Sequence, residues 1–382
     1  MRIVFQYYSG GGGGLANFVM LLQAYLRRFR EDHITIVCSK SSALRSLASE
    51  PNVDFVILGE GRFKELVRFW LGCMGLNAIA KRNRADVVWS LNLGSYVRGG
   101  VPSIISLNNA HQIYPQEATT THPGGGVRVF LLRSFFRLSA RAANGIVVQT
   151  PLMASYVRDR CGKNYPVAVI PKAVEADRDV YFEPLPASIS GRLERASGSV
   201  ESNWLYVATS IPHKNHTVII RAFEVLRRRG RKFRLVLTID EDCAIQWGGE
   251  VARELIRDGA LVALGWVSKE HLKALYSECD ACVMPSVLES LSSSHLEAME
   301  WGLPQVATDL PYARDLCGDA AIYVNPHDAE EWALAVERLA EDESLRKLIV
   351  AEGRKRMDAF PSSWTECAER VRLFLRSVKS AN

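Results

Sequence analysis

The feature that most constrains the fold of this chain is a repeated alternation of short, apolar, β-rich runs with longer amphipathic segments. This alternation is typical of α/β proteins, in which helices cover a parallel sheet. In the first half the expected strands are RIVFQYY, HITIVCS, VDFVIL, DVVWSL, PSIISLN, GIVVQT and VAVIP. In the second half they are WLYVAT, FRLVLTI, LVALGW, ACVMP, PQVATD and AIYVN. We therefore expect an α/β chain with two Rossmann-like, doubly wound halves.

The length of 382 residues also predicts two domains, because single hydrophobic cores usually divide before this size. A polar segment with several prolines and glycines separates the two sets of runs, as linkers do. We expect an N-terminal domain at 1–182, a linker at 183–202 and a C-terminal domain at 203–360. A last helix at 361–382 is expected to pack back toward the N-terminal domain. Ligands of doubly wound sheets bind outside the carboxyl ends of the strands, which predicts a cleft between the two domains.

Positive charge is concentrated in the first half of the chain. Residues 1–180 carry 22 Lys and Arg against 12 Asp and Glu, whereas the remainder carries 25 against 30. Such a bias favours anionic partners, including phospholipid surfaces and phosphorylated substrates. No nucleic-acid-binding motif accompanies the charge, so nucleic acid is not an expected partner.

The sequence carries no secretion signal at its start and no apolar run long enough to cross a bilayer. The eight cysteines are scattered, which is typical of reduced thiols. Cys279 and Cys282 form a C-x-x-C, but no second pair follows at zinc spacing. We expect a cytoplasmic protein that contacts the inner face of the cytoplasmic membrane.

Three stretches follow expected strands and are candidates for ligand contact. The first is the glycine run SGGGGGLANF, in which Gly13 and Gly14 could bring backbone amides close to phosphate or sugar oxygens. The run also matches G-x-G-x-x-A, but no acidic residue ends the second strand, which disfavours a nicotinamide cofactor. The second is YVATSIPHKNH, where Lys214 can approach a phosphate and the alternative is a solvated loop lysine.

The third stretch is ESLSSSHLEAMEWGLP, which has two glutamates eight positions apart. A serine at 292, 293 or 294 can cap the helix that follows, and Gly302 and Pro304 end it. Glu289 then lies before the helix and Glu297 one turn inside it. Two carboxylates around a helix N-terminus suit a polyhydroxy ligand that carries a phosphate.

The second half of the chain resembles the retaining GT-B glycosyltransferases, specifically glycosyltransferase family 4. The resemblance rests on PSVLESLSSSHLEAMEWGLPQVATD, PYARDLCGDAAIYVNPHD, LGWVSKEHLKALYSECDACVMPS and TSIPHKNHTVIIRAFEVL, and it extends to ANGIVVQTPLMASYVRD and VIPKAVE. It implies a GT-B fold in which the C-terminal domain holds a nucleotide-diphosphate sugar, with UDP and GDP the favoured nucleotides. The N-terminal domain would hold the acceptor.

The same resemblance assigns roles to individual positions. Glu297 would bind the donor ribose, Glu289 the donor sugar and Lys214 the diphosphate. Ser290, Leu291 and Ser292 replace the family's G-F-G turn, whose amides meet sugar and phosphate. Thr209 stands where the family has a phosphate-binding arginine, so one cation is missing and His213 is a candidate replacement.

A histidine in the first half completes the candidate site. The stretch SLNNAHQIYP follows an expected strand, and family members commonly carry there a histidine that contacts the donor sugar. His111 is the nearest candidate, although a lone histidine is often only structural.

The implied chemistry is the transfer of a sugar with retention of configuration. Cations and amide dipoles would stabilise the charge that develops on the leaving diphosphate, without a metal or other cofactor. The sequence Asp240-Glu241-Asp242 formally matches the D-x-D motif of metal-dependent transferases, but it lies late in the chain, within the second half.

The acceptor side is suggested by the segment VRVFLLRSFFRLSARAA. It places Arg133, Arg137 and Arg141 on one helical stripe among apolar residues. Together with the basic first half and the apolar segment WLGCMGLNAIAKRNR, this stripe favours adsorption to anionic lipid. The alternative is a packed helix whose arginines reach past the core to solvent.

These observations predict a glycosyltransferase that adds a sugar to a lipid-linked, lipopolysaccharide or polysaccharide acceptor in bacterial surface glycan synthesis. The alternatives are a GT-B epimerase or phosphorylase, and a catalytically degenerate binding subunit. The identities of the nucleotide base, the sugar and the acceptor depend on pocket shape and are left open.

Overall fold

The computed structural model describes residues 1–8, 13–59, 63–115, 125–173, 183–195 and 200–380. Within these residues the chain forms two compact units, and the last helix belongs to the first of them. The division falls after residue 173, and a helix, α6 (Ala187–Arg195), occupies part of the segment expected as a linker.

Unit 1 is built on a parallel sheet. Among the described residues it has seven strands, in the order β3-β2-β1-β4-β5-β6-β7. The strands are β1 (Arg2–Tyr7), β2 (His33–Ser39), β3 (Val53–Leu58), β4 (Val87–Leu91), β5 (Ser103–Ser106), β6 (Gly145–Val148) and β7 (Val167–Val169). The helices are α1 (Gly13–Arg28), η1 (Ala43–Ser49), α2 (Lys64–Trp70), the π-helical turn η2 (Leu71–Gly75), α3 (Leu76–Arg82), η3 (Ala110–Gln112), α4 (Gly125–Ala142), α5 (Pro151–Cys161) and α15 (Trp364–Ser380).

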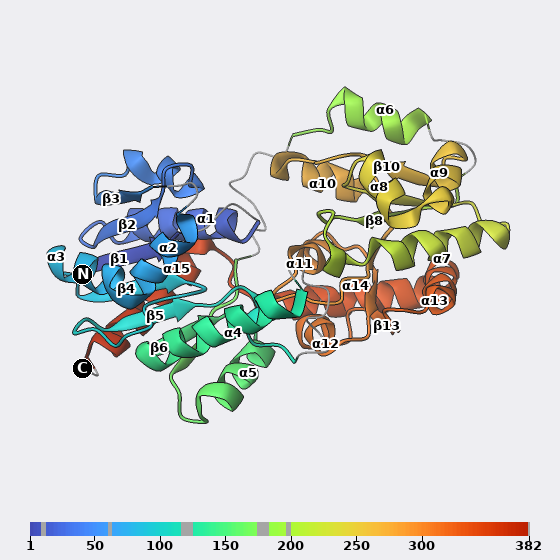
Figure 1. Cartoon of the computed structure of the whole chain (residues 1–382). Coiled ribbons are helices and arrows are strands. Elements are labelled where there is room, and N and C mark those ends of the chain that lie inside the picture. The colour runs from blue at the N-terminus through green and yellow to red at the C-terminus, as the bar shows by residue number, and fades with distance from the viewer. Residues whose placement is uncertain (9–12, 60–62, 116–124, 174–182, 196–199, 381–382) are drawn as a thin grey trace. The chain divides into compact units, whose positions relative to one another are not determined.

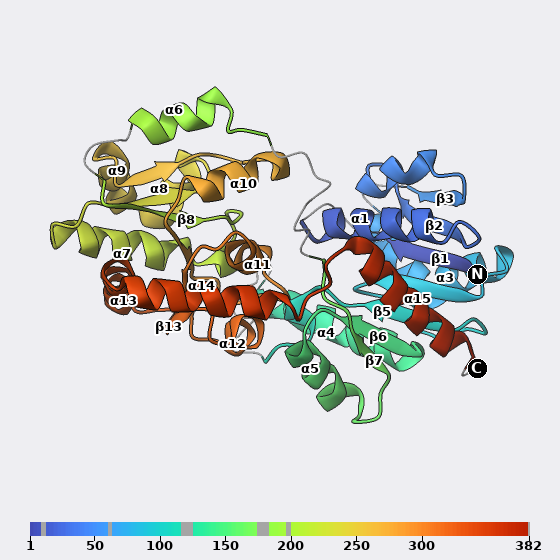
Figure 2. The ribbon, with the colours of Figure 1, turned by 180° about the vertical axis from the view of Figure 1, so that it is seen from behind.

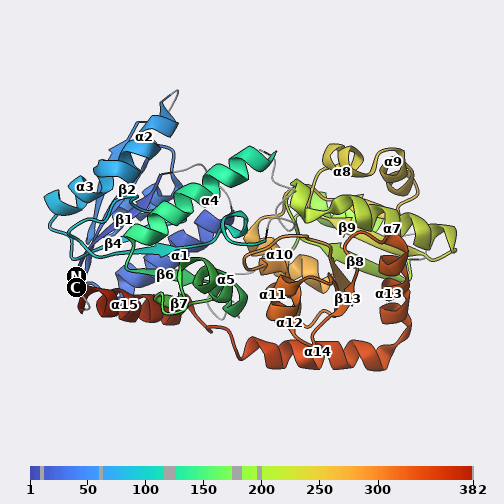
Figure 3. The same ribbon diagram turned by 60° about the horizontal axis from the view of Figure 1, so that its bottom comes forward.

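The strands of unit 1 have apolar side chains on both faces because helices cover both. Along β1, Ile3 and Phe5 pack in the core with α1 and α15, whereas Val4 packs on the other face with η2 and α3. The opposite placement of α15 and of α2, α3 and α4 is visible in Figure 3. This double coverage explains why the strands appear in the sequence as continuous apolar runs.

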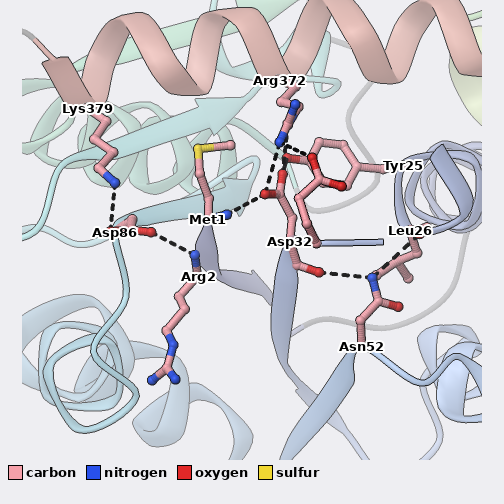
Figure 4. A network of polar contacts seen from close by, with 10 residues as sticks. Met1, Arg2, Tyr25, Leu26, Asp32, Asn52, Asp86, Arg372 and Lys379 are labelled. Carbon is pink, nitrogen blue, oxygen red and sulfur yellow. Dashed lines mark hydrogen bonds and ion pairs between the residues drawn. The ribbon is translucent and has the colours of Figure 1, made fainter. Parts of the chain in front are cut away.

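The last helix, α15, is fixed to unit 1 by a buried polar network (Figure 4). The Asp32 carboxylate is fully buried and accepts hydrogen bonds from Tyr25 Oη and Arg372 Nε, both at 2.8 Å, and from the Met1 amino group. Burial opposes ionisation of Asp32, but these donors hold its pKa below the usual value. At the end of α15, Lys379 pairs with Asp86 at 2.9 Å. Helix α15 is thus held at two points along its length, and Figure 2 shows this helix lying across unit 1.

Unit 2 repeats the doubly wound arrangement (Figure 1). Its described residues form a parallel sheet of six strands, in the order β10-β9-β8-β11-β12-β13. The strands are β8 (Ser202–Tyr206), β9 (Phe233–Leu237), β10 (Leu261–Ala263), β11 (Ala281–Met284), β12 (Gln305–Thr308) and β13 (Ile322–Val324). The helices besides α6 are η5 (Pro212–Lys214), α7 (His216–Arg228), α8 (Glu241–Gly248), α9 (Glu250–Arg257), α10 (Lys269–Ser277), α11 (Ser293–Glu300), α12 (Pro311–Cys317), α13 (Ala329–Glu341) and α14 (Glu343–Met357).

Both sheets have a topological switch point, where the chain changes its direction of winding. It lies between β1 and β4 in unit 1 and between β8 and β11 in unit 2. Loops leaving the carboxyl ends of such neighbouring strands diverge and leave a ligand crevice between them. The fold therefore singles out the loops after β8 and β11 in unit 2, and those after β1 and β4 in unit 1.

Candidate active site

Lys214 and Glu289 meet at the switch point of unit 2. Lys214 ends η5 in the connection after β8, and Glu289 lies in the loop between β11 and α11. Lys214 Nζ donates to Glu289 Oε1, and the two side chains are only 15% and 12% exposed. The two residues chosen from separate sequence motifs thus form one ion pair.

The environment keeps Glu289 ionised. Burial would raise the pKa of this carboxyl group, but the charge and hydrogen bond of Lys214, with smaller contributions from His213 and Ser286, hold the pKa below its usual value. A carboxylate fixed in this way can accept hydrogen bonds from sugar hydroxyls. The neighbouring ammonium can in turn contact a phosphate oxygen.

Asn215 ties the two loops of this site to a third. Its Nδ2 donates to the carbonyl oxygens of Pro285, at 3.2 Å, and of Pro326, at 2.7 Å. The backbone of Asn215 is left-handed, with φ of 55°, a conformation that asparagine tolerates better than most residues. Asn215 therefore fixes the direction in which the chain leaves Lys214 and enters α7.

Two tyrosines complete this support. Tyr206, the last residue of β8, donates from Oη to the Lys214 carbonyl oxygen at 2.8 Å and lies 2.9 Å from Ser286 Oγ. Tyr312 Oη donates to the Ser286 carbonyl oxygen at 2.6 Å. Burial raises the pKa of Tyr206 well above its usual value, so its hydroxyl remains a donor. The ion pair is thereby held by groups on both strands of the switch point.

Replacing Asn215 tests this support directly. We expect Asn215→Gly to lower the free energy of unfolding by about 1–3 kcal/mol, since it keeps the left-handed backbone but removes both amide bonds. Asn215→Ala removes the same bonds and adds a left-handed alanine, which should cost about 1 kcal/mol more. Denaturant unfolding of the two variants measures the difference. Equal stabilities of Asn215→Ala and the unaltered protein would contradict the role given to Asn215.

Helix α11 brings Glu297 and the serine-rich turn to the same edge of the sheet. Ser292 is the residue before α11, but its side chain makes no capping hydrogen bond to the first turn. Ser294 instead donates from Oγ to the Val207 carbonyl oxygen at 2.6 Å and so joins α11 to the loop after β8. The amide groups at the start of α11 are therefore not capped by Ser292 and suit an anionic ligand.

Glu297 has a different environment from Glu289. It lies in the second turn of α11, partly buried, and accepts a hydrogen bond from Tyr276 Oη at 3.1 Å. Tyr276 comes from α10 and is fully buried against Trp301, with ring centroids 4.5 Å apart. One carboxylate is thus paired with a cation and the other with a neutral hydroxyl, which allows them to serve different parts of a ligand.

The residues in the place of the G-F-G turn are not equivalent. Leu291 is buried in a cluster that includes Leu296 and Met299, so its side chain serves the core and only its backbone can serve a ligand. Ser290 is partly buried, whereas Ser292 is buried.

Thr209 is exposed in the loop before η5, and its carbonyl oxygen accepts a hydrogen bond from the Ile211 amide at 3.0 Å. His216, two residues after Lys214, does not supply the cation that is missing at Thr209. It is fully buried, with its ring between those of Tyr206 and Trp247. Burial, together with the charge of Lys214, lowers its pKa to about 3, so it is neutral at physiological pH. His213 remains the candidate, because its charge contributes to the lowered pKa of Glu289.

The candidates in unit 1 lie after β1 and β5. Gly13 and Gly14 open α1, and residues 9–12 of the glycine run lie outside the described residues. His111 lies in η3, after β5, and is 8% exposed. The side chain of Asn109 accepts a hydrogen bond from the His111 amide at 3.1 Å. Gly13, Gly14 and His111 thus belong to unit 1, whereas Lys214 and Glu289 belong to unit 2.

Arg133 has a role that the sequence pattern did not indicate. Its guanidinium donates to the carbonyl oxygens of His111, at 3.1 Å, and Tyr114, at 2.6 Å. Arg160 of α5 also donates to the Tyr114 oxygen, at 3.2 Å. The three arginines of the helical stripe therefore do not act alike, because the Arg133 side chain supports the His111 loop. Nothing in the helical spacing distinguishes Arg133 from the other two.

The acidic and cysteine motifs have structural roles here. Asp240 is the N-cap of α8 and accepts a hydrogen bond from the Cys243 amide at 2.7 Å. Cys279 and Cys282 are both buried, and burial raises the pKa of each thiol. Among the described residues, no group of three or more His, Cys, Asp and Glu side chains is arranged to hold a metal ion.

Comparisons with known proteins agree with this architecture in both units. Residues 12–178 match the family model described as Glycosyltransferase Family 4, and residues 201–342 match the model described as Glycosyl transferases group 1. Among solved structures, the sucrose-phosphate synthase of Thermosynechococcus elongatus aligns over 100% of both chains with a TM-score of 0.70 and 16% identity. Anabaena Alr3699/HepE, solved in complex with UDP and glucose, aligns over 99% of this chain and 100% of its own with the same TM-score and identity. At this identity the likeness concerns the fold.

Sequence relatives include two O-antigen chain mannosyltransferases. O-antigen chain mannosyltransferase B of Escherichia coli is 27% identical over 53% of this chain and 53% of its own length. O-antigen chain mannosyltransferase RfbU of Salmonella typhimurium is 30% identical over 36% of this chain and 38% of its own. The matched part of the chain spans about half the length of the first relative and less of the second. The family matches to both halves, together with the fold, support a glycosyltransferase of the GT-B fold.

Proposed function

We propose that this protein transfers a hexose from a nucleotide-diphosphate sugar to a growing bacterial surface glycan. The acceptor is lipid-linked or a lipopolysaccharide or polysaccharide chain, at the inner face of the cytoplasmic membrane. The observation that carries the proposal is the Lys214–Glu289 ion pair beside the start of α11, which the Ser292 side chain does not cap, at the switch point of unit 2. Mannosyltransferases among the relatives favour mannose as the sugar, and the two that are named for the O-antigen chain favour O-antigen as the glycan.

The donor would lie across the loops after β8 and β11. Its diphosphate would contact Lys214 and the first amides of α11, its sugar Glu289, and its ribose Glu297. His111 of unit 1 is proposed to contact the donor sugar, and Gly13 and Gly14 to contribute backbone amides. Thr209 supplies no cation, so His213 is proposed as the second group that faces the diphosphate.

The proposed reaction proceeds with retention and without a metal. The bond between the sugar anomeric carbon and the diphosphate oxygen breaks, and the acceptor hydroxyl oxygen bonds to the same carbon from the same face. A diphosphate oxygen takes the acceptor proton. Lys214 and the helix amides stabilise the negative charge that develops on the leaving group, and such preorganised donors are a major source of catalysis.

Nucleotide binding is the first test. We expect one of UDP and GDP to raise the midpoint of thermal unfolding, because a ligand that binds only the folded state stabilises it. At a nucleotide concentration of about 100 times Kd the gain is roughly 2.7 kcal/mol. ADP and inorganic phosphate serve as controls, and the shift should disappear in Lys214→Ala. A protein that responds to neither UDP nor GDP would contradict the donor site.

Product analysis separates transfer from the alternative reactions. Incubation with the preferred nucleotide sugar and an O-antigen oligosaccharide should give an extended glycan in the presence of a chelator, with the anomeric configuration of the donor retained. An isomerised sugar nucleotide formed without acceptor would identify an epimerase. Sugar phosphate formed only with added phosphate would identify a phosphorylase, and nucleotide binding without any turnover would identify a degenerate binding subunit.

A further inference from the structure

Unit 1 exposes a group of large apolar side chains on α2, η2 and α4. Phe63, Leu66, Phe69, Trp70 and Met74, on or next to α2 and η2, are between 42% and 70% exposed. On α4 the residues Val127, Phe130, Leu131 and Leu138 are between 42% and 75% exposed. Single exposed apolar residues are common, but a contiguous group of this kind usually marks an interaction surface.

The two helices belong to one surface because Tyr96 lies between them. Its ring stacks on Phe135 of α4, with centroids 5.3 Å apart and an interplanar angle of 20°. The same ring meets Phe69 of α2 at 6.4 Å. Val127, Leu131, Phe135 and Leu138 recur at helical spacing and so share one side of α4. We refer to residues 63–82, 95–101 and 125–142 as the α2–α4 face; Figure 3 shows α2 and α4 on the same side of the sheet.

Glycines adapt η2 to these aromatic rings. A Cβ atom on Gly72 would lie 2.1 Å from the Tyr96 ring, and one on Gly75 would lie 2.5 Å from the Trp70 ring. The Tyr96 amide also donates to the Gly72 carbonyl oxygen at 2.6 Å. The exposed aromatic side chains are therefore attached to a closely packed segment, η2 and its neighbours.

The charge of the α2–α4 face is almost purely positive. Its sequence contains a single acidic residue, Glu65, which pairs with Arg68. Arg133 is also engaged, as described above. The remaining cations are exposed: Lys64, Lys81, Arg82, Arg98, Arg128, Arg137 and Arg141.

We propose that the α2–α4 face docks this protein on an anionic lipid bilayer, with its aromatic and aliphatic side chains in the interfacial layer and its Lys and Arg side chains on the headgroups. Exposed aromatic groups flanked by cations are the pattern of interfacial membrane binding. A second copy of the chain fits less well, since a two-fold symmetric contact would bring like charges together. The described part of the chain contains no helix with the length and hydropathy needed to span a bilayer.

This inference deepens the proposed function, because it assigns a lipid partner to the unit expected to receive the acceptor. It also changes which residues of the surface suggested by the sequence are available for lipid contact. The arginine stripe of α4 alone includes Arg133, which is turned toward the His111 loop. The structure adds α2, and its ring contacts join α2 to α4, although the apolar residues of α2 and η2 are more than 50 positions away from α4 in the chain.

Vesicle binding by the full chain tests the proposal. With vesicles of phosphatidylcholine and phosphatidylglycerol, we expect the double variant Leu66→Ser/Leu131→Ser to bind at least tenfold more weakly than the unaltered protein. Lys64→Glu/Arg128→Glu should weaken binding similarly, and phosphatidylcholine alone should bind poorly. The matched controls are Leu373→Ser, at an exposed leucine of α15 on the other side of the sheet, and Lys347→Glu in unit 2. Both controls should bind as the unaltered protein does.

The depth to which the face enters the bilayer is tested through the fluorescence of Trp70. Brominated lipids should quench the fluorescence of the unaltered protein and quench Trp70→Phe clearly less. Equal vesicle binding by Leu66→Ser/Leu131→Ser and the unaltered protein would overturn the proposal. So would a dimer in solution that this variant abolishes, since the face would then pair two copies. Thermal unfolding and the nucleotide-induced shift of each variant are measured in parallel, so failure of membrane docking is distinguishable from failure of the donor site.

Discussion

Replacing Lys214 by alanine is expected to lower kcat/KM for sugar transfer by about 100- to 1000-fold, the usual cost of losing one preorganised group that stabilises transition-state charge. The ammonium is held by Glu289, and Tyr206 and Asn215 fix the backbone on either side of it. Its loss therefore removes a charge that is already in position. Steady-state kinetics with the preferred nucleotide sugar measures the effect.

The partner variant and a matched control make this prediction specific. Glu289→Gln keeps the size of the side chain but removes its charge, and should lower kcat/KM at least about tenfold, or 1.4 kcal/mol. Lys347→Ala removes a lysine of unit 2 that is exposed and paired with Glu343, and should leave kcat/KM unchanged. If Lys214→Ala and Glu289→Gln both fold and transfer sugar at the unaltered rate, the site is assigned to the wrong residues.

Replacing Asp32 by alanine is expected to lower the free energy of unfolding of unit 1 by about 3–5 kcal/mol, as is usual when one partner of a buried ion pair is removed. The variant would leave the largely buried Arg372 guanidinium and the Tyr25 hydroxyl without their shared acceptor. Hydrogen exchange should show loss of protection in α1 and α15, because the network joins these two helices.

Glu31 provides the matched control for Asp32. Its carboxylate accepts from the same guanidinium, at 2.6 Å, but it is 64% exposed. Glu31→Ala should therefore change the stability by no more than about 1 kcal/mol. Equal losses for Glu31→Ala and Asp32→Ala would contradict the role of burial in this network.

The contribution of Asp32 depends on pH in a defined direction. Its pKa is lowered in the folded protein, so the folded state binds protons less readily than the unfolded chain. The stabilisation is fully present above the ordinary aspartate pKa of about 3.9 and is lost as the pH falls below it. Acid unfolding of Asp32→Asn should accordingly lack the loss of stability that protonation of Asp32 causes in the unaltered protein.

The elements of the fold were largely predictable because hydrophobic pattern is a local property. Each expected strand run contains or overlaps a strand of one of the two sheets, and the α/β class follows from their alternation with helices. The helix inside the expected linker was not predicted. Helix α6 forms in a polar, glycine-containing segment, and Arg192 and Leu193 connect it to unit 2 through the Ala263 carbonyl oxygen and Arg234. Such contacts lie 41 or more positions away in the chain and leave no local signal.

The candidate site was likewise predictable from the sequence only in part. The motifs around Lys214, Glu289 and Glu297 could be found in the sequence because each residue lies at a fixed offset from an expected strand or helix. The side chains that hold these residues in place could not be found in this way. Tyr276, at the end of an ordinary amphipathic helix, has nothing local to indicate its bond to Glu297.

The sequence by itself thus determined the fold class, the two-sheet organisation and the loops that carry the chemistry, since these depend on periodicity and on glycine, proline and serine positions. The tertiary structure decided which side chains meet: that Lys214 pairs with Glu289, that Arg133 turns toward the His111 loop, and that α2 and α4 share one exposed face. The reason is physical. Strand order and helix rotation bring together residues far apart in the chain, and ion pairs and ring contacts depend on distances that no local pattern encodes.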